Sequence, residues 1–290
     1  MAHPDRRRAE NVPGPLYVDT TCIDCDTCRW MAPRIFADVG DQSAVVHQPE
    51  DATERLAAYK ALVACPTASI GTTERHPEMK QATRAFPDPI VDGVGHCGYH
   101  AESSFGAASY FIERPGGNVL VDSPRFVPPL VDAIRARGGI RYLYLTHRDD
   151  VADQAKWAAA FGCERILHAD DVTRATKDVE IQPEGEDALL LAPDLKVLPV
   201  PGHTRGHSVL LYQDKVLFSG DHLAWSARRQ DLTAFRGACW YSWEHQTRSM
   251  RKLQDERFEW VLPGHGRRVH LPHDQMQASL GRLVAWMERA

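Results

Sequence analysis

One stretch, residues 142–154, constrains the fold more than any other part of the sequence. It reads YLYLTHRDDVADQ: an apolar, β-forming run ends at Thr146, then a histidine and three aspartates precede a helical pattern. Histidine and carboxylate groups are common metal ligands, and here they stand at the C-terminal end of a predicted strand. The stretch therefore indicates half of a metal site, whose other ligands are expected further along the chain.

Three later segments repeat this arrangement, each with a metal-binding residue beside glycine or proline after an apolar strand. A lone histidine near a strand end is more often a hydrogen-bonded surface or core residue. The recurrence favours a shared metal site over that explanation. The segments are LPVPGHTRGH with His203 and His207, VLFSGDHL with Asp221 and His222, and WVLPGHG with His265.

The bulk composition narrows the class of protein. The chain has 290 residues, which allows one large and one small domain, and its formal net charge is -5 without a broad basic patch. Nucleic acid is therefore disfavoured as a partner. No apolar run approaches the roughly 18 residues of a membrane span, and no apolar segment follows the arginines at residues 6–8. We expect no membrane insertion and a cytoplasmic location.

Four of the seven cysteines follow a specific spacing. Cys22, Cys25 and Cys28 are separated by two residues each, and Cys65 is followed at once by Pro66. Three thiolates on one tight loop can hold three corners of a cubane cluster, and a distant Cys-Pro can supply the fourth. A zinc site is the alternative, but zinc sites usually take their cysteines as pairs. The spacing favours an iron–sulfur cluster in a reducing compartment.

Residues 16–72 resemble a bacterial-type single-cluster ferredoxin. The resemblance extends from the cysteines to Ala32-Pro33, Phe36 and the ACPTASI run that ends at Ile70. Because all four cysteines are present, it implies a [4Fe-4S] cluster bound by Cys22, Cys25, Cys28 and Cys65.

The chain is predicted to contain two domains. We expect a flexible tail at residues 1–15, a small α+β ferredoxin-like domain at 16–74, a polar, proline-punctuated linker at 75–88 and a larger domain at 89–290. Strand-like segments are mixed with helical patterns in the larger part, and two of these patterns predict helices at 128–137 and 151–161. Such mixing is typical of a layered α/β domain. Two of the strands flank Gln213-Asp214 and predict a hairpin.

From about Val91 onward the chain resembles the metallo-β-lactamase fold superfamily, on the motifs GHTRGH, GD and GH. The resemblance implies an αββα sandwich with a dinuclear metal site at one edge of two sheets. His147 and His203 would bind the first metal, Asp221 would bridge both metals, and His265 would bind the second. His207 would support the loop without binding metal.

The first motif departs from the family pattern H-x-H-x-D-H. Asp149 replaces the second histidine as a ligand, and Asp150-Val151 stands where Asp-His is expected. If the loop absorbs two extra residues, Asp153 takes the aspartate position and Gln154 replaces the second-metal histidine. If it does not, the second site lacks ligands.

We favour the two-residue offset, because the clustered aspartates would otherwise repel one another. Asp153 and Asp221 are then the predicted catalytic carboxylates, with Asp153 as base or orienter of the attacking water. A neutral Gln154 predicts that a second ion binds poorly. Carboxylate in place of imidazole shifts the expected metal from zinc toward iron or manganese, so we expect one or two ions of these kinds.

Three functions follow from these motifs. The first is a metal-dependent hydrolase that uses a metal-bound hydroxide on an ester, thioester or related small-molecule bond. The second is an iron-dependent oxidoreductase that receives electrons from the cluster, which would have its own redox partner. The third is a redox-sensing binding protein with a degenerate metal site.

Other polar and aromatic residues carry weaker predictions. His96, Cys97 and His100 are assigned a structural role, with Tyr99 or His100 as an alternative approach to the metal site. Cys163 and Cys239 are ordinary thiols. An aromatic group could line a substrate pocket or fill the core; it comprises Trp225, Trp240, Tyr241 and Trp243.

Overall fold

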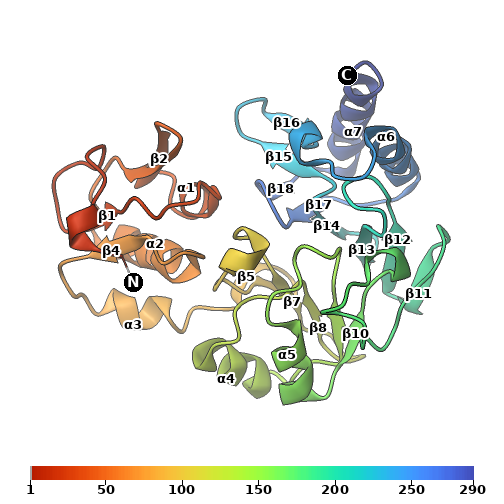
Figure 1. Ribbon diagram of the computed structural model, residues 1–290, viewed down its shortest axis with the longest axis horizontal. Helices are drawn as coiled ribbons and strands as arrows, with labels where there is room; N and C mark the ends of the chain where they lie inside the picture. Colours follow the sequence, from red (N-terminus) through yellow and green to blue (C-terminus); the bar gives the residue numbers. More distant parts are fainter. Residues whose placement is uncertain (1) are drawn as a thin grey trace. The chain divides into compact units, whose positions relative to one another are not determined.

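The structure, a computed structural model, describes residues 2–290 and divides into two compact units (Figure 1). The first comprises the chain up to Glu113 together with Pro124–Gly139, and the second comprises Arg114–Ser123 and Ile140–Ala290. Within residues 2–290, every helix is too short or too polar to cross a bilayer.

The first unit begins with the predicted α+β arrangement around the cysteines. Its strands are β1 (Leu16–Val18), β2 (Phe36–Val39), β3 (Gln42–Val45), β4 (Ile70–Thr72), β5 (Asp88–Val91), β6 (Val94–His96) and β7 (Tyr110–Ile112). Its helices are α1 (Thr27–Met31), α2 (Ala52–Ala64), α3 (Glu78–Ala82), α4 (Pro128–Ala136) and the 3-10 turns η1 (Pro4–Arg6) and η2 (Glu102–Ser104). Strand β1 pairs with β4, β2 with β3, and β5, β6 and β7 form an antiparallel meander.

Helix α2 places one of the four cysteines. Its first turn is capped by the Asp51 side chain, which accepts a hydrogen bond from the Glu54 backbone N–H at 2.8 Å. The helix ends at Ala64 because the residue before a proline avoids helical geometry, and that residue is Cys65. The sequence thus fixes the point at which this thiol leaves the helix.

Two predicted irregular segments contain more structure than expected. The segment at 75–88 contains α3, whose Glu78 pairs with Arg55 of α2 at 3.1 Å. In the predicted tail, Arg8 is buried and donates to the carbonyls of Ser43 at 2.7 Å and Val39 at 2.8 Å. The arginine run is therefore not wholly solvated, and the boundary predicted near residue 89 lies inside the first unit.

The second unit contains two sheets. Strands β8 (Val119–Val121), β9 (Tyr142–Tyr144) and β10 (Glu164–Ile166) run parallel, and α5 (Gln154–Phe161) connects β9 to β10. The other sheet has the order β11, β12, β13, β14, β17, β18. These strands are β11 (Leu189–Ala192), β12 (Leu195–Pro199), β13 (Ser208–Tyr212), β14 (Val216–Gly220), β17 (Trp260–Pro263) and β18 (Val269–His270).

The remaining elements of this unit include two helices that cover the second sheet. They are the hairpin β15 (Ala224–Ser226) and β16 (Asp231–Thr233), helices α6 (Trp243–Lys252) and α7 (His273–Met287), and the 3-10 turns η3 (Ala169–Asp171), η4 (Arg236–Ala238) and η5 (Leu253–Asp255). Met250 of α6 and Leu280 and Leu283 of α7 are buried in one cluster with Val209 and Leu217 of the sheet. Each such side chain contributes about 1.5–3 kcal/mol by burial, which holds the helices on the sheet.

The two sheets meet where strands β9 and β13 approach. The Tyr144 hydroxyl donates to the Ser208 hydroxyl at 2.7 Å, and the Ser208 N–H donates to the Thr146 carbonyl at 2.9 Å. Both contacts lie at the C-terminal end of β9 and the start of β13. The loops with the predicted metal ligands leave the sheets at this edge.

Candidate functional site

His147 is anchored by a short hydrogen-bonded chain behind its ring. Thr146 and His147 follow β9 and are fully buried. The Thr146 N–H donates to Asp122 Oδ1 at 2.8 Å, and its Oγ1 lies 3.0 and 3.1 Å from the two Asp122 carboxylate oxygens. Thr146 Oγ1 also lies 3.0 Å from His147 Nδ1. The backbone and the imidazole are therefore fixed by the same carboxylate.

The hydrogen bonds from Asp122 through Thr146 also select the His147 tautomer. A threonine hydroxyl has one proton, which points to Asp122 when that carboxylate is ionised. Thr146 then accepts from His147 Nδ1–H, so Nε2 has a free lone pair. Nε2 is buried and has no hydrogen-bond partner among residues 2–290. Burial raises the pKa of Asp122 to about 7, so this carboxylate is ionised above that pH. Burial also lowers the pKa of His147 to about 4, so the imidazole is neutral there, as a metal ligand must be.

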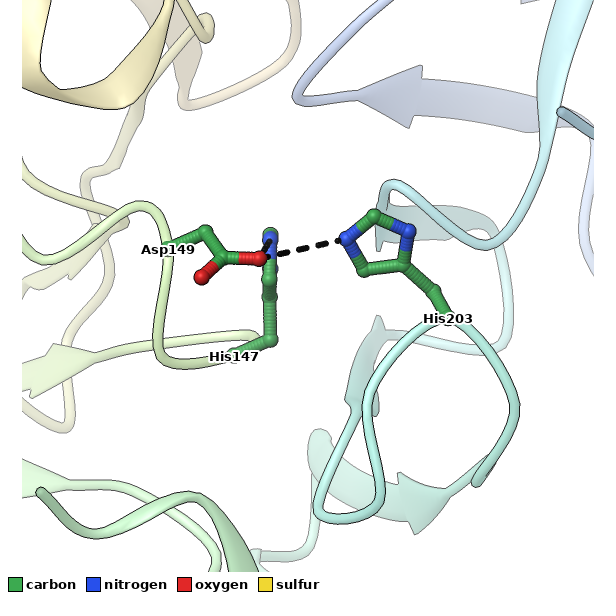
Figure 2. A group of neighbouring side chains, drawn as sticks. All are labelled: His147, Asp149 and His203. Carbon is green, nitrogen blue, oxygen red and sulfur yellow. Dashed lines mark ion pairs between the residues drawn. The ribbon is translucent and has the colours of Figure 1, made fainter. Parts of the chain in front are cut away.

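His203 faces His147 from the loop after β12. Its Nε2 is likewise buried without a hydrogen-bond partner in the described part of the chain. This atom lies 3.6 Å from Asp149 Oδ2 and 3.7 Å from Asp221 Oδ2. Figure 2 shows the side chains of His147, Asp149 and His203 close together, with dashed lines from one Asp149 carboxylate oxygen to each of the two rings. His203 holds the pKa of Asp149 below its ordinary value.

Asp221 is held from two sides. It follows β14, and its N–H donates to His207 Nε2 at 3.1 Å, so His207 supports this loop as expected. Its carboxylate accepts from the His265 N–H at 3.1 Å, and His265 Nδ1 lies 2.8 Å from both carboxylate oxygens. Burial opposes ionisation, but His265 and His147 hold the pKa of Asp221 below its ordinary range.

Asp150 lies in this group of side chains, although the sequence analysis did not select it. Its side chain is buried, and its Oδ2 lies 4.0 Å from His147 Nε2 without a hydrogen-bond partner within residues 2–290. Burial, with the nearby Asp221 charge, raises the pKa of Asp150 well above its ordinary value. A Cβ on Gly264 would lie 2.8 Å from Asp150 Oδ2 and 2.9 Å from Asp221 Oδ1. Glycine at 264 leaves room for both carboxylates.

The structure does not bring Asp153 or Gln154 into this group. Asp153 stands at the start of α5, where its carboxylate lies 2.7 Å from Lys156 Nζ. Gln154 donates to the Ala175 carbonyl at 3.3 Å and accepts from Arg165 at 2.8 Å. The two-residue offset is therefore not what the chain adopts. The helix begins only at 154, and the turn before it points Asp150 inward.

The resulting ligand atoms are arranged as a metal requires. Two groups have all their ligand atoms within 4.8 Å of one another: His147, Asp149 and His203, and His147, Asp150 and Asp221. Ligands about 2.1 Å from a tetrahedral ion are about 3.4 Å apart, close to the 3.6–4.0 Å spacings found here. A cation between buried carboxylates this close would offset their mutual repulsion. The donors suit zinc, iron or manganese.

The four cysteines form a separate site in the first unit. Cys22, Cys25, Cys28 and Cys65 line one cavity together with apolar and hydroxyl-bearing side chains. Asp24 and Asp26, between the cysteines of the loop, have φ angles of 60° and 62°, which wind the chain tightly. Burial raises the pKa of the Cys25 and Cys28 thiols. Four thiolates there need cationic iron to be stable, so the cavity fits a cluster.

A family profile matches this part of the chain. Residues 18–72 match the 4Fe-4S single cluster domain of ferredoxin I. These residues therefore belong to the single-cluster ferredoxin family. The match assigns a [4Fe-4S] cluster to this ferredoxin domain as its cofactor, as predicted, and with β1–β4 around the cavity it confirms the small α+β domain.

Solved structures show the fold of the remainder. DIM-1 metallo-β-lactamase aligns with a TM-score of 0.54 at 20% identity, covering 69% of this chain and 95% of that one. The TMB-1 structure aligns with a TM-score of 0.53 at 18% identity, covering 70% and 96%. The part of the chain beyond the ferredoxin domain thus has the predicted metallo-β-lactamase fold.

Curated relatives share part of the sequence. Hydroxyacylglutathione hydrolase from Anaeromyxobacter dehalogenans is 36% identical over 122 residues, 41% of this chain and 46% of that protein. The hydroxyacylglutathione hydrolase of Methylococcus capsulatus is 33% identical over 120 residues, 39% and 46%. The chain spans under half the length of these relatives.

The four aromatic residues predicted to line a pocket or fill the core differ in exposure. Trp240 is 62% exposed, and its ring centroid lies 6.2 Å from that of His203. The backbone N–H groups of Trp240 and Tyr241 donate to the His203 carbonyl, which fixes them beside the metal ligands. Trp225 and Trp243 instead pack against the core.

Proposed function

We propose that this chain is a metal-dependent hydrolase that cleaves an ester, thioester or related bond of a small molecule. The observation that carries the proposal is the convergence of two buried imidazole nitrogens, on His147 and His203, with neither hydrogen-bonded within residues 2–290. Carboxylates of three aspartates surround them. An arrangement that leaves so many buried polar atoms unsatisfied is costly unless a cation completes it.

In this proposal some side chains bind the metal ion and another orients the attacking water. A divalent ion bound there would lower the pKa of its water to about 7 and polarise the scissile carbonyl. His147, His203, Asp149 and Asp221 would hold the ion, with Asp221 fixed by His265. We assign to Asp150 the part first given to Asp153: its carboxylate accepts a hydrogen bond from the attacking water and orients it.

A thioester is the preferred substrate class. The curated relatives are named as hydrolases of hydroxyacylglutathione, and the partial match supports the same bond type here. Trp240 offers an exposed apolar face beside His203. We assign this face to the apolar part of the acyl or leaving group.

The cluster has a separate role in this proposal. Cys22, Cys25, Cys28 and Cys65 are its proposed ligands, and it exchanges electrons with an external redox partner. Hydrolysis transfers no electrons, so cleavage is expected to be independent of the cluster's oxidation state.

A second candidate function is an iron-dependent oxidoreductase. It is favoured by the excess of carboxylates over imidazoles around His147, which suits iron, and by the presence of a one-electron carrier in the same chain. In that case the cluster would deliver electrons to the metal centre.

One experiment separates the two functions. The full chain is purified without oxygen, analysed for metal, and assayed with a hydroxyacylglutathione thioester with the cluster oxidised and then reduced. We expect metal-dependent hydrolysis at equal rates in both states, lost in His203→Asn and retained in the exposed control His270→Asn. Absence of hydrolysis in metal-loaded protein, with oxygen consumed only when the cluster is reduced, would establish the oxidoreductase.

The same preparation tests metal stoichiometry. With Gln154 engaged by Arg165, a second ion is still expected to bind weakly. Two tightly bound equivalents of non-cluster metal per chain would contradict this.

A further inference from the structure

Two buried histidines lie beside the ferredoxin domain, and the proposed hydrolase does not use them. His96 ends β6, His100 follows four residues later, and both side chains are buried in the first unit. Their Nε2 atoms are 2.7 Å apart. His100 Nδ1 lies 2.6 Å from the Gly106 carbonyl oxygen and 3.2 Å from Thr27 Oγ1. Thr27 belongs to α1, between two of the cluster cysteines.

The partners of His100 fix the direction of these hydrogen bonds. A carbonyl oxygen can only accept, so His100 Nδ1 must have the proton. In the neutral ring Nε2 then has the lone pair and accepts from His96 Nε2–H. The same Nδ1–H is shared with Thr27 Oγ1 at 3.2 Å. Thr27 Oγ1 therefore accepts in this contact, which leaves its own proton available.

That proton is directed at a cluster ligand. Thr27 Oγ1 lies 3.4 Å from Cys25 Sγ, and a thiolate can only accept. The hydroxyl therefore donates to the sulfur when Cys25 is ionised. The order of donation is His96 to His100, His100 to Thr27, and Thr27 to Cys25.

Aromatic side chains and one glycine enclose these hydrogen-bonded residues. The Trp30 ring lies 5.1 Å from the His96 ring and 6.3 Å from the His100 ring, and Phe86 packs edge-on against His96 at 5.7 Å. Gly106, which holds His100, has a φ of 84°, and a Cβ there would lie 3.1 Å from Cys25 Sγ. Thr27, His96 and His100 are buried, and a hydrogen bond in a buried setting is electrostatically stronger than in solvent.

We propose that His100, held in one tautomer by His96, is a positioning residue for the cluster: it aims the Thr27 hydroxyl at Cys25 Sγ, and this hydrogen bond raises the cluster's reduction potential. Reduction adds one electron, supplied by a low-potential one-electron donor such as a reduced viologen, and breaks no bond. The added negative charge is spread over the thiolate sulfurs, where a donor stabilises it. The inference rests on the proposed cluster ligands.

The test is a redox titration of the full chain, with a viologen as donor and cluster absorbance as the readout. Thr27→Val removes the hydroxyl but keeps the shape, and Thr27→Ser retains it. At a fixed solution potential, we expect Thr27→Val to lower the ratio of reduced to oxidised cluster about tenfold. This corresponds to a reduction potential about 59 mV lower for a one-electron couple. Thr27→Ser should match the wild type, as should the control His76→Asn on an exposed turn.

A second variant tests the role of His100 itself. His100→Leu should lower the reduction potential as Thr27→Val does. The double variant should lower it little further, because both changes interrupt the same series of hydrogen bonds. If His100→Leu does not fold, the comparison of Thr27→Val with Thr27→Ser tests the inference by itself. An unchanged potential in Thr27→Val with full iron content overturns the inference. A wild-type chain that takes up no iron overturns the cysteine assignment itself and, with it, this inference.

Discussion

The Oδ2 atom of Asp150 lies 4.0 Å from Nε2 of His147, and neither atom has a hydrogen-bond partner among the described residues. Two buried polar atoms that face each other without a hydrogen bond are unfavourable in a folded chain. A cation at this point would satisfy both. Asp150, which the sequence analysis did not select, therefore belongs with His147, the histidine that first indicated a metal site.

Replacing Asp150 is expected to weaken metal binding without destabilising the metal-free protein. Asp150→Asn should weaken metal binding by at least about 10-fold. The metal-free variant should be no less stable than the wild type at neutral pH, because burial disfavours the ionised carboxylate. Competition with a chelator and urea unfolding measure the two quantities.

Asp153→Asn is the matched control for that variant. Asp153 pairs with Lys156 on the first turn of α5, so this change should leave metal affinity unaltered. A loss of metal in Asp153→Asn, with Asp150→Asn unaffected, would restore the two-residue offset expected from the sequence.

Thr146 is expected to control the His147 tautomer. Thr146→Val keeps the shape of the side chain but removes the hydroxyl between Asp122 and His147. Metal affinity should fall about 10- to 100-fold, as for other residues that orient metal ligands. Thr146→Ser should bind metal as the wild type does, and equal affinity in the valine variant would exclude the tautomer argument.

The stability of the metal-free protein is expected to fall below pH 6.5, partly because of His222. Burial lowers the pKa of His222 to about 3, below the value of about 6.5 in an unfolded chain. The stabilisation is complete above pH about 6.5 and is lost as the pH falls toward about 3. One pH unit in this window corresponds to at most about 1.4 kcal/mol per histidine.

Urea unfolding of wild type and His222→Leu at two pH values measures that contribution. Between pH about 6.5 and about 5.5 the wild type should lose about 1 kcal/mol more than the variant. Equal losses would show that His222 does not resist protonation. His270→Asn, on an exposed strand, should retain the wild-type difference.

Features that depend on neighbouring residues are predicted from the sequence better than features that depend on residues far apart in it. The hairpin around Gln213-Asp214 is confirmed, because both residues adopt the positive φ angles of 56° and 49° that a tight turn requires. The helix expected at 128–137 appears as Pro128–Ala136. These features depend on neighbouring residues alone, so local patterns suffice to predict them.

The turn between β9 and α5 could not be predicted in this way. Spacing along the chain does not say which of Asp149, Asp150 and Asp153 points inward, because that depends on where the helix begins. The helix was expected from Val151 and begins at Gln154. The burial of Asp150, which identifies it, comes from Gly264 and Asp221, far away in the sequence. Likewise, nothing local places His100 beside Thr27.

Trp240 is expected to affect substrate binding without affecting the fold. Its side chain is 62% exposed, so Trp240→Ala should change stability by less than about 0.5 kcal/mol. For an apolar thioester KM should rise about fivefold, which corresponds to about 1 kcal/mol of aromatic contact, with kcat unchanged. A fall in kcat at constant KM would contradict this role. Phe105→Ala, another exposed aromatic, is the control.

The most direct test of the metal centre is anomalous diffraction from crystals of the full chain grown without oxygen. We predict a single strong peak, apart from the cluster, within about 2.0–2.2 Å of His147 Nε2, His203 Nε2 and an Asp221 oxygen. Ordered His147 and His203 side chains in metal-supplemented crystals, with no peak between them, would contradict the account.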